Sequence, residues 1–438
     1  MMKYLATFLL LTGPFYAFNQ QFDTSKLGKF LDLVEENERG MGSLSIFKDG
    51  KEVYQKSIGY SSLSDRKKAN EKTSYRIGSI SKTFTASIIM QLIVEKRLSL
   101  ETKLADYFPE IPNANSITIA YLLRHRSGIF NFTNSKDFAD WMTTPQTKET
   151  LLSRIVSFRP VFEPNEKAEY SNSNYVLLSW IIEEIEKKPY PRVLNERIVS
   201  ACQLNRTKYG GKIDAKQNEA FSYIKPDDWE LSLESDMSIL QGAGGIASSP
   251  TDLNKFLNCL FEGKVVSKDM VARMTQINDG FGLGMLQVPF YSKKAYGHTG
   301  GIDGFSSMAY FFPDEQVAVA YISNGTVMPV NDILIGVLSI YFGMDYDLPA
   351  FISVEKEILE KYEGIYGDSS FPLDISVFIN GEQLMAQATN QAAFALEAVS
   401  ENVFKFSPAG IIMTFTSEEN QMIFEQMGAK HKLTKKYP

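Results

Sequence analysis

Strand-like segments occur in two widely separated groups in this sequence. Residues 43–46 and 53–60 alternate apolar and polar side chains around an Asp-Gly turn, which is typical of a hairpin. Residues 308–312 and 317–321 alternate in the same way around a Pro-Asp-Glu turn. The simplest architecture joins the two groups in one antiparallel sheet and treats the residues between them as an insertion.

The residues between the two groups have a helical pattern. From Ser79 the apolar side chains follow helical spacing, and residues 100–287 contain helix-like segments separated by loops rich in Pro, Asn and Gly. A further helix is expected at 330–342, after the last strands. The predicted fold class is α+β, with an antiparallel sheet flanked by helices and a large helical insertion.

Beyond about residue 350 the pattern changes to short alternating runs separated by turns. The runs are 373–379, 384–388, 411–415 and 422–424. Several short strands at regular intervals indicate a separate small β-barrel. The chain has 438 residues, of which 44% are hydrophobic, and is long enough for more than one domain.

The N-terminus resembles a secretory signal. Lys3 is followed by an apolar run at 4–12, a Gly-Pro breaker and a small residue at Ala17, and the run is too short to span a bilayer. A buried strand or an uncleaved anchor is the alternative. The expected division is a signal peptide at 1–20, a main domain at 21–348 and a barrel domain at 355–438. We expect the protein to be exported, to the periplasm or outside the cell, with no stable membrane span apart from an uncleaved signal.

Composition excludes several classes of partner and site. The net charge of -7 and the absence of basic runs make nucleic acid an unexpected partner. The three histidines are far apart and no His-Glu-x-x-His occurs, so we expect no metal or other cofactor. Cys202 and Cys259 have no metal-ligand spacing, and a disulfide and two free buried thiols are both open.

The Ser79-x-x-Lys82 pair is the first candidate for chemistry. At the start of a helix this spacing puts both side chains on one face, about 5–6 Å apart at Cβ. A buried, neutral lysine can take the proton of the serine hydroxyl, and the helix start directs N–H groups at a developing oxyanion. Other Ser-x-x-Lys pairs occur in the chain, but only this one combines a strand, a glycine and a long apolar helix.

Two further groups could complete such a site. Tyr170 could relay a proton to a leaving group, and Asn172 could hold Lys82 and a substrate carbonyl. The alternative is that Tyr170 is a loop tyrosine that packs on the following helix. His298-Thr299-Gly300-Gly301 precedes the late strands, and its adjacent glycines could admit a substrate, with the N–H groups of Ser79 and Gly301 as oxyanion donors.

Together these motifs resemble the serine β-lactamase and penicillin-binding protein family. Ser79-Ile80-Ser81-Lys82, Tyr170-Ser171-Asn172 and His298-Thr299-Gly300 occur in the family's order and at its intervals. Further segments agree with the family, namely residues 122–128 (Leu-Leu-Arg-His-Arg-Ser-Gly), 162–165 (Phe-Glu-Pro-Asn) and 242–245 (Gly-Ala-Gly-Gly). The resemblance covers about residues 30–345, and the tail is similar to the lipocalin-like domain of some members.

The resemblance implies an acyl-enzyme hydrolase without a cofactor, whose substrate is a small molecule or a peptide, including cell-wall peptides. His298 occupies a position where β-lactamases usually have lysine, and the histidine form is similar to D-alanyl-D-alanine carboxypeptidases, D-aminopeptidases and esterases. No arginine lies between Met274 and Gly301, which disfavours a substrate with a terminal carboxylate. D-Amino-acid peptides are the expected substrates. The alternatives are a carboxylesterase or a β-lactamase and, from another class, a penicillin-binding sensor that does not turn over or an interaction protein.

Overall fold

The predicted antiparallel sheet is present in the computed structural model, which describes residues 22–437 except 382, 390, 407, 408 and 427. The predicted signal peptide at 1–20 therefore lies outside the described residues. In sheet order the strands are β10 (Leu286–Phe290), β11 (Lys293–Ile302), β12 (Phe305–Phe312), β13 (Val317–Thr326), β1 (Gly40–Lys48) and β2 (Lys51–Ile58). Strand β1 pairs antiparallel with β13, so the two ends of the segment join as predicted.

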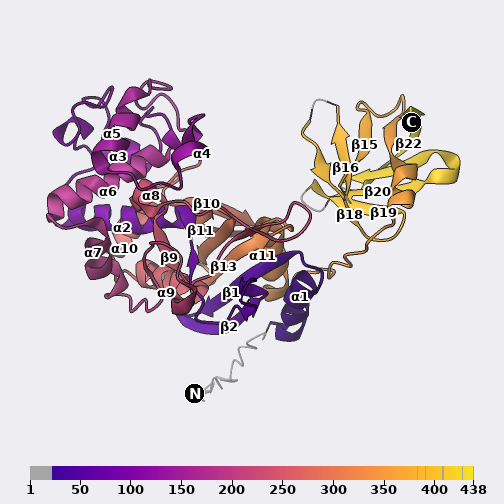
Figure 1. Ribbon diagram of the computed structural model, residues 1–438, viewed down its shortest axis with the longest axis horizontal. Coiled ribbons are helices and arrows are strands. Elements are labelled where there is room, and N and C mark those ends of the chain that lie inside the picture. The colour runs from indigo at the N-terminus through magenta and orange to yellow at the C-terminus, as the bar shows by residue number, and fades with distance from the viewer. Residues whose placement is uncertain (1–21, 382, 390, 407–408, 427, 438) are drawn as a thin grey trace, which may run out of the picture.

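Helices cover both faces of this sheet (Figure 1). On one face, α1 (Thr24–Glu36) and α11 (Val330–Tyr341) share an apolar cluster with the strands. On the other face, α9 (Pro250–Phe261) contacts β1, β12 and β13 and belongs to the larger cluster that continues into the helical insertion. The central strands β1 and β13 are thus buried on both sides, and the face that contacts α9 is the one that packs on the helical insertion.

Helix α2 (Ser81–Val94) lies at the centre of the insertion. The sequence predicts one apolar stripe on this helix, but every residue from Ser81 to Met90 is buried. The reason is that α6 (Asn172–Glu186), α7 (Tyr190–Leu194) and α8 (Met237–Gly244) all contact it. The other helices of the insertion are α3 (Ile119–Leu123), α4 (Phe138–Trp141), α5 (Lys148–Ser157) and α10 (Lys268–Met274).

Further short strands lie before residue 100 and within residues 100–287, the region that the sequence predicts as mostly helical. They are β3 (Tyr60–Ser62) with β4 (Lys67–Lys68), β7 (Tyr223–Ile224) with β8 (Glu230–Leu231), and a three-stranded sheet of β5 (Tyr75–Arg76), β9 (Ile246–Ser248) and β6 (Lys208–Tyr209). The pairing of β5 with β9 brings the glycine-rich segment 242–245 next to the turn that carries Ser79.

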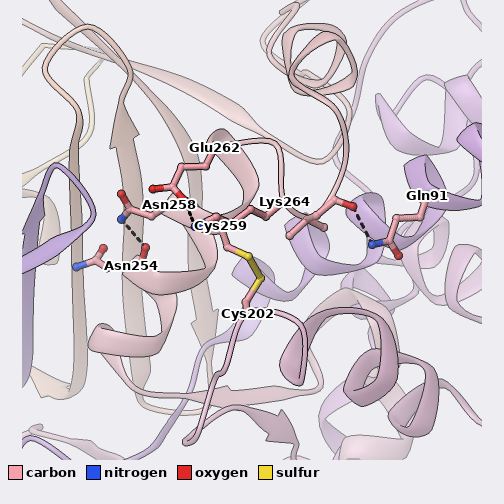
Figure 2. Close-up of a disulfide and its surroundings, with 8 residues drawn as sticks. Gln91, Cys202, Asn254, Asn258, Cys259, Glu262 and Lys264 are labelled. Carbon is pink, nitrogen blue, oxygen red and sulfur yellow. Dashed lines mark hydrogen bonds and ion pairs between the residues drawn. A yellow bond between two sulfur atoms is a disulfide. The ribbon is translucent and has the colours of Figure 1, made fainter.

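A disulfide joins Cys202 to Cys259, with their Cα atoms 6.0 Å apart (Figure 2). The sequence leaves this pairing open. The bond ties the loop after residue 199 to α9, across 57 residues of chain.

The C-terminal strands form a nine-stranded antiparallel sheet, which Figure 1 shows in orange to yellow as a lobe of its own. In sheet order they are β17 (Phe394–Ala395), β16 (Gln383–Ala388), β15 (Ile375–Asn380), β14 (Gly364–Gly367), β22 (Ala429–Tyr437), β21 (Gln421–Gln426), β20 (Ile411–Thr416), β19 (Val403–Phe406) and β18 (Glu397–Ala398). The two outermost strands, β17 and β18, are consecutive in sequence, so the sheet curls back on itself like a barrel. Its apolar side chains form a separate cluster. The predicted α+β fold with a small C-terminal barrel is confirmed.

Candidate active site

Ser79 lies in a 3-10 turn (Gly78–Ile80) between β5 and α2. Gly78 has φ +51, and a Cβ atom there would come within 2.8 Å of the Gly301 nitrogen. Only glycine allows this conformation so close to a neighbouring backbone. The turn that carries Ser79 is therefore pressed directly against β11.

Lys82 lies one helical turn after Ser79, and its Nζ is 3.0 Å from Ser79 Oγ. The side chain is fully buried, and Nζ also donates to Asn172 Oδ1 and to the Ala243 carbonyl oxygen, each at 2.7 Å. Burial holds the pKa of the Lys82 amine well below its ordinary value of 10.5. The amine is thus surrounded by two acceptors and one hydroxyl, with no carboxylate among these partners.

Tyr170 is a second neighbour of Ser79, and its hydroxyl donates to Ser79 Oγ at 2.6 Å. Burial raises the pKa of the phenol above its ordinary value of 10.0. Asn172 is the first residue of α6, and its Nδ2 donates to Thr133 Oγ1 at 3.0 Å, which turns Oδ1 toward Lys82. The Tyr170 hydroxyl thus contacts Ser79 directly, and the alternative of a loop tyrosine that only packs on the next helix does not account for this contact.

His298 lies on β11, is buried, and donates from Nδ1 to the Thr299 carbonyl at 2.5 Å. Burial, with a smaller effect of the Lys82 charge, lowers the pKa of the imidazole to about 4. Its ring centroid is 6.3 Å from that of Tyr170. The sequence-predicted groups therefore meet at one place, and His298 adds no positive charge to it near neutral pH.

The two glycines after Thr299 differ in what surrounds them. A Cβ at Gly300 would lie 2.0 Å from the Ile77 carbonyl oxygen, whereas a Cβ at Gly301 meets nothing within 4 Å. The sequence suggests that both glycines admit a substrate. Gly300 instead lets β11 approach the backbone before Ser79, and Gly301 alone is exposed beside the serine.

His125 is a site residue that the sequence does not single out. Its backbone has φ +57, its ring centroid is 4.5 Å from that of Tyr170, and its Nδ1 accepts the Ser171 N–H at 3.1 Å. Burial lowers the pKa of this imidazole well below 6.5. The family-like segment 122–128 contains His125 and could have indicated it. The sequence alone, however, does not show that this histidine packs against Tyr170, which is 45 residues later in the chain.

Arginines near the site are engaged by other partners. Arg126 pairs with Asp279 and also bonds Asn165, and Arg124 donates to the carbonyl oxygens of Gln276 and Phe281. Each of these guanidinium groups thus ties loops around the site together.

The arrangement suits nucleophilic chemistry at Ser79. The Ser79 hydroxyl has a buried amine and a phenol both within hydrogen-bond distance. Within the described part of the chain, no group of three or more His, Cys, Asp or Glu side chains could hold a metal ion. No helix in that part combines the length and apolar character required to cross a bilayer.

Comparisons with known proteins agree with this geometry. A sequence profile of the Beta-lactamase family matches residues 29–336. Penicillin-binding protein 4* of Bacillus subtilis (strain 168) is 25% identical over 432 residues, which is 90% of this chain and 94% of that protein.

Two solved structures are similar in fold. The D-amino acid amidase of Ochrobactrum anthropi SV3, solved with D-phenylalanine, has a TM-score of 0.67 and 25% identity, over 73% of this chain and 98% of that one. The octameric penicillin-binding protein homologue of Pyrococcus abyssi has a TM-score of 0.70 and 25% identity, over 95% of this chain and 99% of that one. The second match therefore extends over the C-terminal strands as well.

Proposed function

The chain belongs to the β-lactamase family of serine hydrolases, and from this premise we propose that it hydrolyses amide or ester bonds of small D-amino-acid compounds through an acyl-enzyme on Ser79. The observation that carries the proposal is the pair of contacts on Ser79 Oγ, from the buried Lys82 amine and from the Tyr170 hydroxyl.

Lys82 is the general base in this proposal. A neutral amine has two hydrogens and one lone pair, and its two acceptors, Asn172 Oδ1 and the Ala243 carbonyl, use the hydrogens. The lone pair is then left for the Ser79 hydroxyl, which donates its proton as Oγ attacks the substrate carbonyl carbon. The lowered pKa of Lys82 supports this protonation state near pH 7.

Tyr170 is the proton carrier to the leaving group. Its raised pKa keeps the phenol protonated, so it can give a proton to the departing nitrogen or oxygen and recover one that Lys82 has taken from Ser79. The N–H groups of Ser79 and Gly301 stabilise the oxyanion. Water then attacks the acyl-enzyme by the reverse path, with Lys82 again as base.

The substrate class rests on charge and on similarity. With His298 neutral and Arg126 paired to Asp279, no fixed cation among these site residues is free to bind a terminal carboxylate. An amide or a peptide with a D-amino acid on the acyl side fits better than a C-terminal carboxypeptide. The similarity to a D-amino acid amidase supports the same class. The signal-like N-terminus supports a place of action outside the cytoplasm.

Turnover of a substrate panel tests this function. The panel contains D-amino-acid amides, D-Ala-D-Ala peptides, p-nitrophenyl esters and nitrocefin, with Ser79→Ala as the inactive control. We expect amides and esters to be turned over faster than nitrocefin, and His298→Lys to shift the ratio toward substrates with a carboxylate. Fastest turnover of nitrocefin would identify a β-lactamase, and acylation without turnover would identify a sensor.

A further inference from the structure

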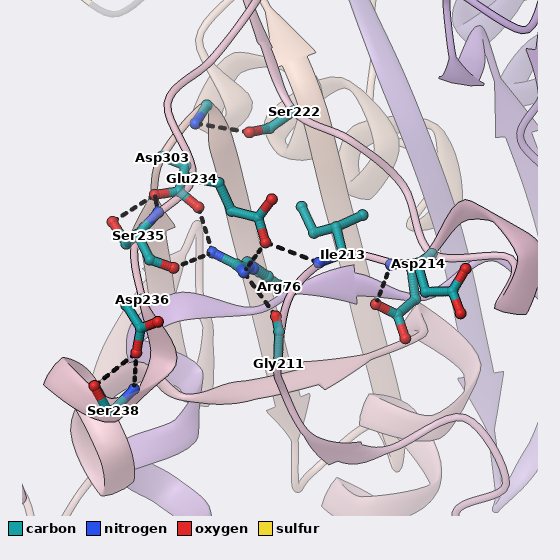
Figure 3. A network of polar contacts seen from close by, with 12 residues as sticks. Arg76, Gly211, Ile213, Asp214, Ser222, Glu234, Ser235, Asp236, Ser238 and Asp303 are labelled. Carbon is teal, nitrogen blue, oxygen red and sulfur yellow. Dashed lines mark hydrogen bonds and ion pairs between the residues drawn. The ribbon is translucent and has the colours of Figure 1, made fainter. Parts of the chain in front are cut away.

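Arg76 is a buried arginine three residues before Ser79, and its side chain is only 3% exposed. Its guanidinium donates four hydrogen bonds to three different chain segments (Figure 3). The acceptors are the carbonyl oxygens of Gly211 and Ser235 and the carboxylates of Glu234 and Asp303, at 2.6–2.8 Å. The planar fork of an arginine can satisfy four acceptors in fixed directions, which a lysine cannot do.

Asp303 is the partner that matters for the site. It follows Gly301 by two residues, in the turn between β11 and β12, and its side chain is completely buried. One oxygen accepts from Arg76, and the other accepts from the backbone N–H and the hydroxyl of Ser235, at 2.9 and 2.6 Å. Both carboxylate oxygens of Asp303 therefore have defined partners, and Figure 3 shows Arg76 and Ser235 directed at this carboxylate.

The ion pair spans the two segments that carry the oxyanion donors. Arg76 leads into the Ser79 turn, and Asp303 closes the strand end that contains Gly301. The backbones of the two segments are in contact, because a Cβ at Gly78 would lie 2.8 Å from the Gly301 nitrogen and a Cβ at Gly300 would lie 2.0 Å from the Ile77 oxygen. From β12, Ser307 Oγ also donates to the Ile77 carbonyl at 2.9 Å. A shift of either segment would change the separation of the Ser79 and Gly301 N–H groups.

Stability alone is a weak reason to keep such a pair. Replacing a buried ion pair by apolar groups of similar volume is often neutral or stabilising, because both charges must be desolvated. Buried pairs are best attested where they fix one geometry among several. Here that geometry is the distance between two N–H groups that must face one oxygen atom.

We propose that the Arg76–Asp303 ion pair is a positioning device that sets the spacing of the Ser79 and Gly301 N–H groups. This inference rests on the proposed function, since it presupposes acylation of Ser79. Ser235 is the third residue of this positioning device, because its hydroxyl donates to the Asp303 oxygen that Arg76 does not contact. None of the three side chains is assigned a proton in the reaction.

The test uses the full chain and two serines of the same segment. Ser235→Ala removes a bond to Asp303, whereas the matched control Ser238→Ala removes a bond to Asp236, which contacts neither Arg76 nor Asp303 in Figure 3. Asp303→Asn is the stronger variant. The measurements are kcat and KM for a p-nitrophenyl ester, the inhibition constant of phenylboronic acid, which forms a tetrahedral adduct with an active serine, and the thermal midpoint.

We expect Asp303→Asn to lower kcat by up to about 100-fold, and Ser235→Ala to lower it by a few-fold, since small misplacements of catalytic groups have effects of this size. KM should change little, and the inhibition constant of the boronic acid should rise in parallel with the loss of kcat/KM. Ser238→Ala should match the wild type.

The outcomes separate this inference from the proposed function. A wild type that turns over no ester and binds no boronic acid overturns both. An active wild type whose Ser235→Ala variant equals Ser238→Ala in kcat and in boronic acid inhibition overturns the positioning role alone. If Asp303→Asn melts at a much lower temperature, the two serine variants decide. A loss that falls on KM, with boronic acid inhibition unchanged, also contradicts the proposal.

Discussion

At the candidate nucleophile, burial moves the pKa values of the two neighbouring proton carriers in opposite directions. It lowers the pKa of Lys82, a cationic acid, and raises the pKa of Tyr170, a neutral acid, because in both cases the uncharged form is favoured. Both shifts favour the uncharged form of the pair, in which the Lys82 amine and the Tyr170 hydroxyl lie within hydrogen-bond distance of Ser79 Oγ.

Replacing either carrier should slow acylation without unfolding the protein. We expect Lys82→Ala and Tyr170→Phe each to reduce the acylation rate by about 10²–10⁴-fold, the usual size of general acid–base assistance. Stopped-flow measurement of p-nitrophenol release gives the rate, and circular dichroism checks the fold. Rates close to wild type in both variants would show that another group takes the proton, and His298 would be the first to examine.

The pH dependence of kcat/KM follows from the same two shifts. On the acid side kcat/KM should rise with pH as Lys82 loses its proton. Because the pKa of Lys82 is lowered, kcat/KM should reach its plateau at a pH well below 10.5. No alkaline fall is expected below about pH 10, because the raised pKa keeps Tyr170 protonated there. A rate that climbs steadily to pH 10.5 would mean that Lys82 titrates like an exposed lysine.

Among the elements, the contact between β11 and the Ser79 turn is the most restrictive. Gly300→Ala should lower the thermal midpoint of unfolding and abolish the covalent reaction of Ser79 with a fluorophosphonate. The reason is that the new Cβ would lie 2.0 Å from the Ile77 oxygen. Gly301→Ala is the matched control for stability, since its Cβ would meet open space. Equal thermal midpoints for the two variants would show that β11 can move away from the turn.

Local patterns predicted the elements that depend on neighbouring residues. The hairpins β1–β2 and β12–β13 and helix α2 follow from alternation, turn residues and helical spacing. Long-range features were not predictable in this way. The Arg76–Asp303 pair joins residues 227 apart, and the Ala243 carbonyl reaches Lys82 because of a non-helical residue, Gln241, inside α8.

For the whole molecule, we propose that residues 355–438 form a separable domain. Their apolar side chains cluster apart from the two clusters of the rest of the chain, and the segment 344–355 contains no helix or strand. Limited proteolysis should therefore cut between about Tyr346 and Glu360 and leave a fragment in which Ser79 still reacts. Unfolding of the trimmed protein would show that the barrel is part of the catalytic core.

The central claim is that Ser79 is the nucleophile, and the intact mass after treatment with a fluorophosphonate tests it most directly. Among the Ser-x-x-Lys pairs of the described residues, only Ser79 has both a buried amine and a phenol within hydrogen-bond distance of its hydroxyl. We predict one addition to the wild-type protein and none to Ser79→Ala, which keeps the fold. Labelling of Ser79→Ala at another serine, or an unlabelled wild type, would contradict the account.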